Sequence, residues 1–110
     1  MSFVTHYRGR LHKYAGRFDE SMLVQEVTLD EYLALQYPPV LVEKFPEQAH
    51  TDRQSERSEI LAATLPGDTL WLWRWLDWSH VVDGVPLDRG GLAVRRAEKI
   101  IRIWLVWEGY

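Results

Sequence analysis

The chain has 110 residues, no cysteine and a formal net charge of −3 at pH 7. This length is typical of one domain with one hydrophobic core, and the apolar and charged fractions of 46% and 26% argue against a disordered or fibrous chain. The lack of cysteine excludes disulfides, thiolate metal sites and a cysteine nucleophile. Without a signal-peptide pattern or a membrane-length apolar stretch, we expect a cytoplasmic protein of a single domain over residues 1–110.

The charges are distributed unevenly along the chain. Residues 1–17 carry four basic residues and no acidic one, whereas residues 18–59 carry ten acidic residues and three basic ones. Two interpretations follow: the basic and acidic segments face each other within the fold, or the basic segment meets an external anion. The overall negative charge argues against a general nucleic-acid binder.

The first 20 residues contain a short repeat of the pattern Tyr-x-Gly-Arg-apolar, at 7–11 and again at 14–18. Glycine weakens a helix, so we expect a basic, irregular arm or an edge strand here. Arginine beside aromatic residues is also typical of sites that bind phosphates and stack on bases. The anion-binding candidates are Arg8, Arg10, Arg17, Tyr7 and Tyr14.

The next segment, residues 28–64, is predicted to be helical and to follow a strand over about 22–27. Thr28 and Glu31 have the spacing of a capping box, which starts a short helix that Pro38 and Pro39 end. Residues 40–42 fit either a short strand or an extended connector. A second capping box at 51–54 predicts a helix that runs to about Thr64.

The last third of the chain predicts β structure. Its expected elements are strands over 69–76, 90–95 and 99–107, a loop over 77–89 and a tight turn at 96–98. Together these elements define an α+β fold, in which a small antiparallel β-meander over 69–107 packs against one or two short helices. The N-terminal half is expected to add one or two further strands.

The sequence contains six tryptophans, all after residue 70, and five of them lie in predicted strands whose two faces are both apolar. Alternation places Trp71, Trp73 and Trp75 on one face and the intervening leucines and Arg74 on the other. In the last strand, alternation places two sets of residues on opposite faces: Ile101, Ile103, Leu105 and Trp107 on one, and Ile100, Trp104 and Val106 on the other. Either the arm or the long loop covers the second face, or part of that face is an interface. The interface candidates are Trp71, Trp73, Trp75, Arg74 and Trp104.

Catalytic and metal patterns are weak. Ser79, His80 and Asp83 are too close in sequence to converge as a triad from separate elements. His50 and Asp52 would need a further ligand to form a metal site, and Asp52 is explained by its place near a helix start. No catalytic residue, metal site or cofactor is therefore assigned.

Residues 65–107 resemble a group of small uncharacterised bacterial proteins. The matching features are Leu65-Pro66-Gly67-Asp68, Leu70-Trp71, Trp78, the run from Arg89 to Arg95 and an apolar final strand. The resemblance implies a turn, a strand and a C-terminal β-hairpin, with no activity attached. It differs at 97–98, where this chain has Ala-Glu and the group has a glycine turn.

These patterns favour a small, non-catalytic protein-interaction module that uses an aromatic sheet face to bind itself or another protein. The alternative is anion or single-stranded nucleic-acid binding through the basic arm. A third hypothesis is a small metal-dependent hydrolase that uses His50, Asp52 or His80. A membrane partner is not expected.

Overall fold

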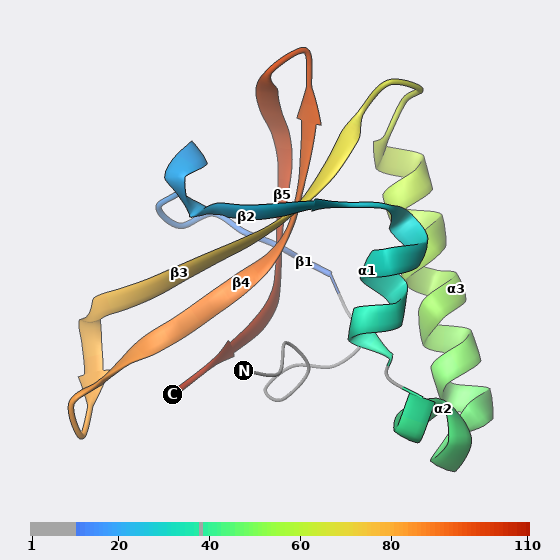
Figure 1. Ribbon diagram of the computed structural model, residues 1–110, viewed down its shortest axis with the longest axis horizontal. Coiled ribbons are helices and arrows are strands. Elements are labelled where there is room, and N and C mark those ends of the chain that lie inside the picture. Colours follow the sequence, from blue (N-terminus) through green and yellow to red (C-terminus); the bar gives the residue numbers. More distant parts are fainter. Residues whose placement is uncertain (1–10, 38) are drawn as a thin grey trace.

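The computed structural model describes residues 11–37 and 39–110, which form one antiparallel sheet with helices against it (Figure 1). The strand order is β1-β5-β4-β3-β2. The strands are β1 (His12–Lys13), β2 (Leu23–Val27), β3 (Thr69–Val82), β4 (Val85–Arg96) and β5 (Lys99–Gly109). The helices are η1 (Glu20–Met22, a 3-10 turn), α1 (Leu29–Gln36), α2 (Pro39–Lys44) and α3 (Pro46–Ala63). The expected α+β class and β-meander are confirmed.

Local capping explains where the helices begin. The Thr28 hydroxyl accepts a hydrogen bond from the Glu31 N–H (3.1 Å), and the Glu31 carboxylate accepts one from the Thr28 N–H (2.8 Å), as the sequence predicted. The other helix predictions were wrong in detail. Residues 40–42 belong to α2, and α3 starts at Pro46, so the expected second capping box lies inside the helix. The N–H groups of the first helical turn have no partner within the helix. Proline has no N–H, so it suits this position.

The long hairpin of β3 and β4 replaces the loop that was expected over 77–89. Its turn is Asp83-Gly84, with φ of 51° and 78°, and Val82 pairs with Val85 on either side. Two residues at positive φ form the turn that matches the twist of paired strands, and Asp-Gly is well suited to it. Strand pairing therefore continues well past Leu76, and Figure 1 shows this hairpin extending away from the helices.

Two irregularities in β5 overturn the predicted alternation of that strand. The pairing with β4 shifts between Gly90 and Gly91 and again between Val94 and Arg95. The first shift places Trp107 in the same cluster as Trp104, and the second places Ile100 with the cluster of the opposite face. An extra residue in one strand reverses the side that each later residue faces.

Each face of the sheet has its own cover, so the question of the second face is answered within the chain. On one face, Leu72 and Trp104 pack with Tyr32 of α1 and Ile60 of α3. On the other face, Trp73 packs with Met22, and its ring lies 4.8 Å from that of Tyr14 and 5.6 Å from that of Phe18, centroid to centroid. The segment from Tyr14 to Met22 is therefore part of the core.

The turn between β4 and β5 provides a test of backbone strain. Ala97 and Glu98 both have positive φ, at 48° and 68°, which confirms the expected tight turn but costs about 1 kcal/mol for a residue with a Cβ. We expect Glu98→Gly to raise the free energy of unfolding by about 1 kcal/mol in urea denaturation. The control is Glu98→Ala, which removes the charge but keeps the Cβ. Equal stabilisation by both variants would show that the charge matters and the backbone does not.

Candidate functional site

The five interface candidates occupy two different environments. Trp73 and Trp104 are 0% and 2% exposed, and the Trp73 indole N–H donates to the Trp104 carbonyl at 3.0 Å. These two side chains are therefore inside the fold and offer no surface to a partner. Trp71, Arg74 and Trp75 are half-buried and remain partly accessible.

The accessible candidates are engaged by charged neighbours. The Arg95 guanidinium lies 5.9 Å from the ring centre of Trp71, and the Arg89 guanidinium lies 5.7 Å from that of Trp75. Arg74 forms a two-pronged ion pair with Asp88, with N–O distances of 3.0 and 2.9 Å. The cations beside Trp71 and Trp75, and Arg74 on the other face of β3, are thus already paired with rings or carboxylates.

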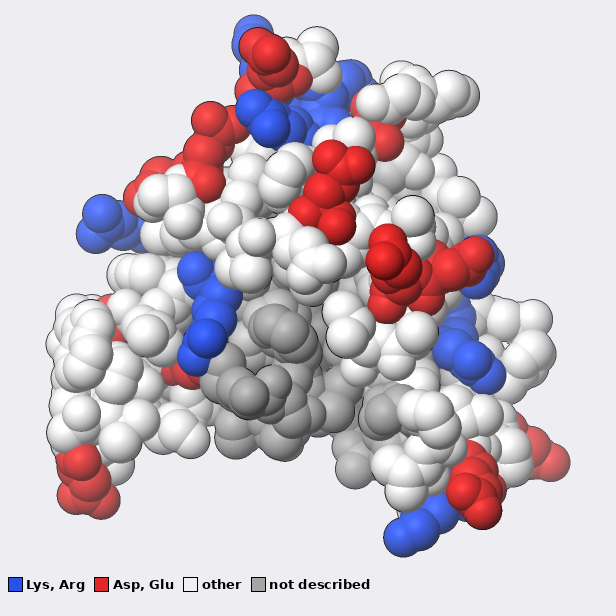
Figure 2. All heavy atoms as spheres, in the orientation of Figure 1, with Lys and Arg blue, Asp and Glu red and all other residues white. Residues whose placement is uncertain are grey.

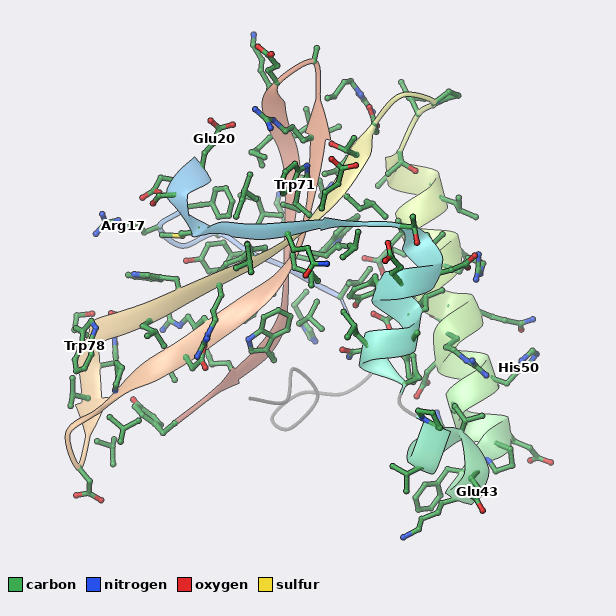
Figure 3. All side chains as sticks on the ribbon, viewed as in Figure 1. Arg17, Glu20, Glu43, His50, Trp71 and Trp78 are labelled. Carbon is green, nitrogen blue, oxygen red and sulfur yellow. The ribbon has the colours of Figure 1, made fainter. Side chains whose placement is uncertain are left out.

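The most exposed tryptophan is Trp78, which was not among the candidates. It is 64% exposed and lies near the far end of the β3–β4 hairpin (Figure 3). Four other apolar side chains in the outer half of the hairpin are 40–49% exposed. We call these five residues the hairpin surface: Leu76, Trp78, Val81, Val82 and Val85. The pattern Val-Val-Asp-Gly-Val was the signal that could have placed them on a hairpin.

The outer half of β3 also has an open backbone edge. β2 pairs with β3 only from Leu70 to Trp73, and no described strand pairs with that edge beyond Trp73. On the face shown in Figure 2, the outer part of this hairpin carries few charged side chains apart from an acidic group at its end. The hairpin therefore combines an apolar surface with unpaired backbone groups.

Asp77 organises the irregular part of this edge. Its carboxylate is buried at 2% exposure and accepts hydrogen bonds from the Ser79 N–H (3.0 Å) and the Ser79 hydroxyl. The hydrogen bond from Ser79 is the main cause that lowers the pKa of Asp77. The strand pairing shifts between Asp77 and Val81, so this carboxylate stabilises a bulge.

The bulge brings a serine, a histidine and an aspartate together, but Asp77 takes the place considered for Asp83. Ser79 Oγ and Asp77 Oδ2 both lie 3.0 Å from the same ring nitrogen of His80, Nδ1. A catalytic triad needs the base to contact the nucleophile and the orienting carboxylate through different nitrogens. The arrangement is therefore that of a backbone-supporting network.

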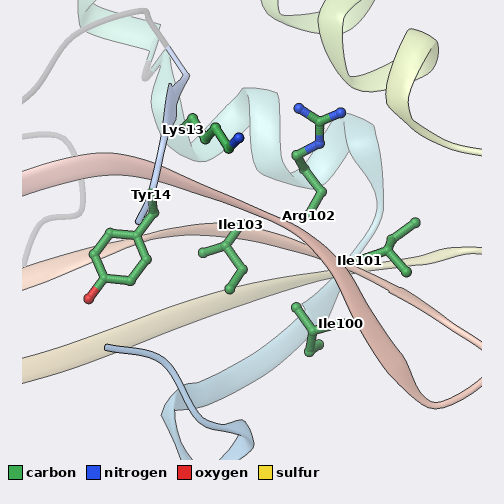
Figure 4. A pocket seen from close by; sticks show the side chains of 6 residues that line it. All are labelled: Lys13, Tyr14, Ile100, Ile101, Arg102 and Ile103. Carbon is green, nitrogen blue, oxygen red and sulfur yellow. The ribbon is translucent and has the colours of Figure 1, made fainter. Parts of the chain in front are cut away.

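A groove runs along the outer edge of β5, where β1 ends (Figure 4). Its volume is about 400 Å³. We call it the β5-edge groove, and its lining residues are Lys13, Tyr14, Ile100, Ile101, Arg102 and Ile103. Two cations thus accompany three isoleucines, with no acidic residue in the lining.

The basic-arm candidates are only partly described. Tyr7, Arg8 and Arg10 lie outside the described residues. Tyr14 packs against Trp73, so that face of its phenol ring is not open to a base. The Arg17 side chain is exposed, with its guanidinium 5.9 Å from the ring centre of Trp75.

The residues of the metal hypothesis lie far apart in the fold. His50 and Asp52 are both on α3, where Gln48 donates a hydrogen bond to Asp52 at 2.9 Å, whereas His80 is on the β3–β4 hairpin. Within residues 11–37 and 39–110, no three histidines or carboxylates are grouped as ligands for a metal ion. The structure does not bring His50 and His80 together.

A buried carboxylate links two helices. Glu56 of α3 is 2% exposed and accepts hydrogen bonds from the hydroxyls of Tyr32 in α1 (2.6 Å) and of Tyr37, the residue that follows α1. Burial raises the pKa of Glu56, and these two hydrogen bonds oppose that effect. The cluster was not predicted, because nothing in the sequence pairs one glutamate with two distant tyrosines.

Comparisons of this chain with models of known protein families, with curated proteins and with solved structures gave no match. Among the described helices, none has the length and apolar content needed to cross a membrane.

The raised pKa of Glu56 predicts a specific pH dependence. Because the folded-state pKa is above the unfolded value, the associated stability is present below the unfolded pKa of about 4.3 and is lost as pH rises through the folded pKa. The measured quantity is the difference in free energy of unfolding between the wild type and Glu56→Gln, from urea denaturation. We expect this difference to decrease as the pH is raised from 4 to 7. Glu47→Gln, at an exposed residue of α3, serves as the control and should follow the wild-type pH profile. A difference that is constant with pH would contradict this assignment.

Proposed function

We propose that the protein is a protein-interaction module that binds through the hairpin surface, with a second copy of the chain as its partner. The observation that carries the proposal is the presence of five exposed apolar residues, of which Trp78 is the most exposed, in the outer half of a projecting two-stranded hairpin. Clustered exposed apolar side chains mark interaction sites, whereas isolated ones are ordinary. Tryptophan is also among the residues that contribute most to binding energy at interfaces.

The open edge of β3 supports a partner that is itself a strand. Unpaired N–H and C=O groups along an edge readily pair with a strand of another chain. Proteins often block such edges with lysine or proline, and β3 has neither after Trp73. The bulge after Asp77 limits continuous pairing to the stretches on either side of it.

The charge of the hairpin supports a second copy as that partner. From Leu76 to Leu87 the acidic residues are Asp77, which contacts His80 and Arg89, and Asp83 in the turn. Two copies of this segment can therefore meet with little repulsion between like charges. A two-fold contact uses the same patch on both subunits, which suits a strand that pairs antiparallel with its own copy.

We expect the wild-type protein to form a dimer that Trp78→Ser weakens strongly. Loss of a central interface tryptophan costs about 2 kcal/mol or more, which corresponds to a rise of about 30-fold in the dimer dissociation constant. Sedimentation velocity over a range of protein concentrations measures this constant directly.

Leu61→Ser is the matched control, because Leu61 is a comparably exposed apolar residue on α3, away from the hairpin. It should leave the dissociation constant unchanged. A wild-type protein that stays monomeric up to millimolar concentration, or an equal effect of both variants, would overturn the proposal.

A further inference from the structure

The β5-edge groove exists because the N-terminal segment leaves the sheet early. β1 pairs with β5 at Trp104 and Leu105, and the last backbone hydrogen bond runs from the Tyr14 N–H to the Ile103 carbonyl at 3.1 Å. The chain then turns onto the face of Trp73, where Phe18 packs. No described strand continues along the edge of β5 from Lys99 to Arg102.

The backbone at this edge limits what can fill the groove. Unpaired N–H and C=O groups of a strand are satisfied best by another extended backbone, which would continue the line of β1. Ile100, Ile101 and Ile103 add apolar walls, and Ile101 is 40% exposed. An extended peptide with apolar side chains therefore matches the shape and the polarity of the groove.

The charges of the groove specify the peptide further. Lys13 and Arg102 are both exposed, and Figure 4 shows their side chains on the same side of β5. Neither forms an ion pair with a described carboxylate, whereas Arg57, Arg74 and Arg96 each do. The Arg102 guanidinium lies 5.8 Å from the ring centre of Trp104. Two adjacent cations without an acidic neighbour favour an anionic ligand.

The same charges disfavour a second copy of the chain in this groove. A two-fold pairing of β5 with β5 would bring the Lys13 and Arg102 cations of both copies together, which is repulsive. Pairing with β2 at the opposite end of the sheet would use two different patches, so it would link many copies into a ring or a filament and not into a two-fold pair. The occupant is therefore a segment of a different protein.

We propose that the β5-edge groove binds an extended, acidic peptide segment, in which carboxylate side chains alternate with apolar ones. The peptide adds a strand to β5, its carboxylates contact Lys13 and Arg102, and its apolar side chains contact the isoleucines. This site is separate from the hairpin surface and does not depend on the dimer.

The test measures binding of a capped eight-residue peptide of alternating glutamate and valine to the full chain, by fluorescence anisotropy. We expect saturable binding that weakens with added salt and that Arg102→Gln weakens about two- to fivefold, the range of one exposed ion pair. Lys13→Gln should have a similar effect. Lys44→Gln, which removes an exposed cation on α2, should have none.

Three further peptides separate the parts of the proposal. A peptide of alternating glutamine and valine should bind at least fivefold more weakly, and equal binding would overturn the role of charge. Two further glutamate–valine peptides, one methylated at every glutamate nitrogen and the other at every valine nitrogen, are each blocked along one of the two strand edges, so unchanged binding of both would overturn strand addition. Amide chemical shifts should change at 99–103 in wild type, and shifts confined to the hairpin surface would also overturn the site. These results do not depend on Trp78→Ser, which tests the dimer alone.

Discussion

The sheet of β3, β4 and β5 is apolar on both faces, and the rest of the chain is arranged to cover both. Leu72 points to the helices and the next residue, Trp73, points to the opposite side, and both are buried. Each large side chain that is fully buried contributes about 1.5–3 kcal/mol, so neither face can be left to water without a serious loss. Helices α1 and α3 cover one face, and the segment from Tyr14 to Met22 covers the other. This double requirement accounts for the path of the N-terminal segment and for the point where β1 leaves β5.

Buried carboxylates hold the covering elements in place. Glu56 links α3 to α1 through two tyrosine hydroxyls. Asp68, in the turn after α3, accepts two hydrogen bonds from Arg96 at 2.8 Å and one from the Leu65 N–H, and the Arg96 contact lowers the pKa of Asp68 to about 2. The turn is thereby tied to the far end of β4. A buried charge is stable only where donors surround it, so these sites define the relative positions of the elements.

Patterns that depend on near neighbours in the chain were predictable from the sequence. The Thr28–Glu31 capping box, the tight turn at 96–98 and the apolar alternation of β3 are all of this kind, because the interacting residues lie within a few positions. The faces of Trp107 and Ile100 were not predictable, since the bulges of β5 depend on its register with β4. The ring of Trp107 lies directly over Gly90, where a Cβ would be 1.9 Å from it. For the candidate site, the sequence indicated an aromatic sheet, but the burial of Trp73 depends on Tyr14 and Phe18, which are distant in sequence. The exposure of Trp78 depends on a hairpin that extends beyond both layers.

The outer half of the β3–β4 hairpin has a dynamic consequence. Beyond Trp73 no described strand flanks β3, so the amides there are protected mainly by one ladder of hydrogen bonds to β4. We expect such a segment to open by local fraying at a small fraction of the global unfolding free energy, and the amides near the buried Leu92 to exchange with solvent only when the whole domain opens. Because Asp77 stabilises the bulge, we expect the fraying to stop there and not to extend toward Trp73. The molecule thus combines a cooperatively folded core with a hairpin end that opens independently. A strand that pairs with the hairpin end would slow hydrogen exchange there without changing hydrogen exchange in the core.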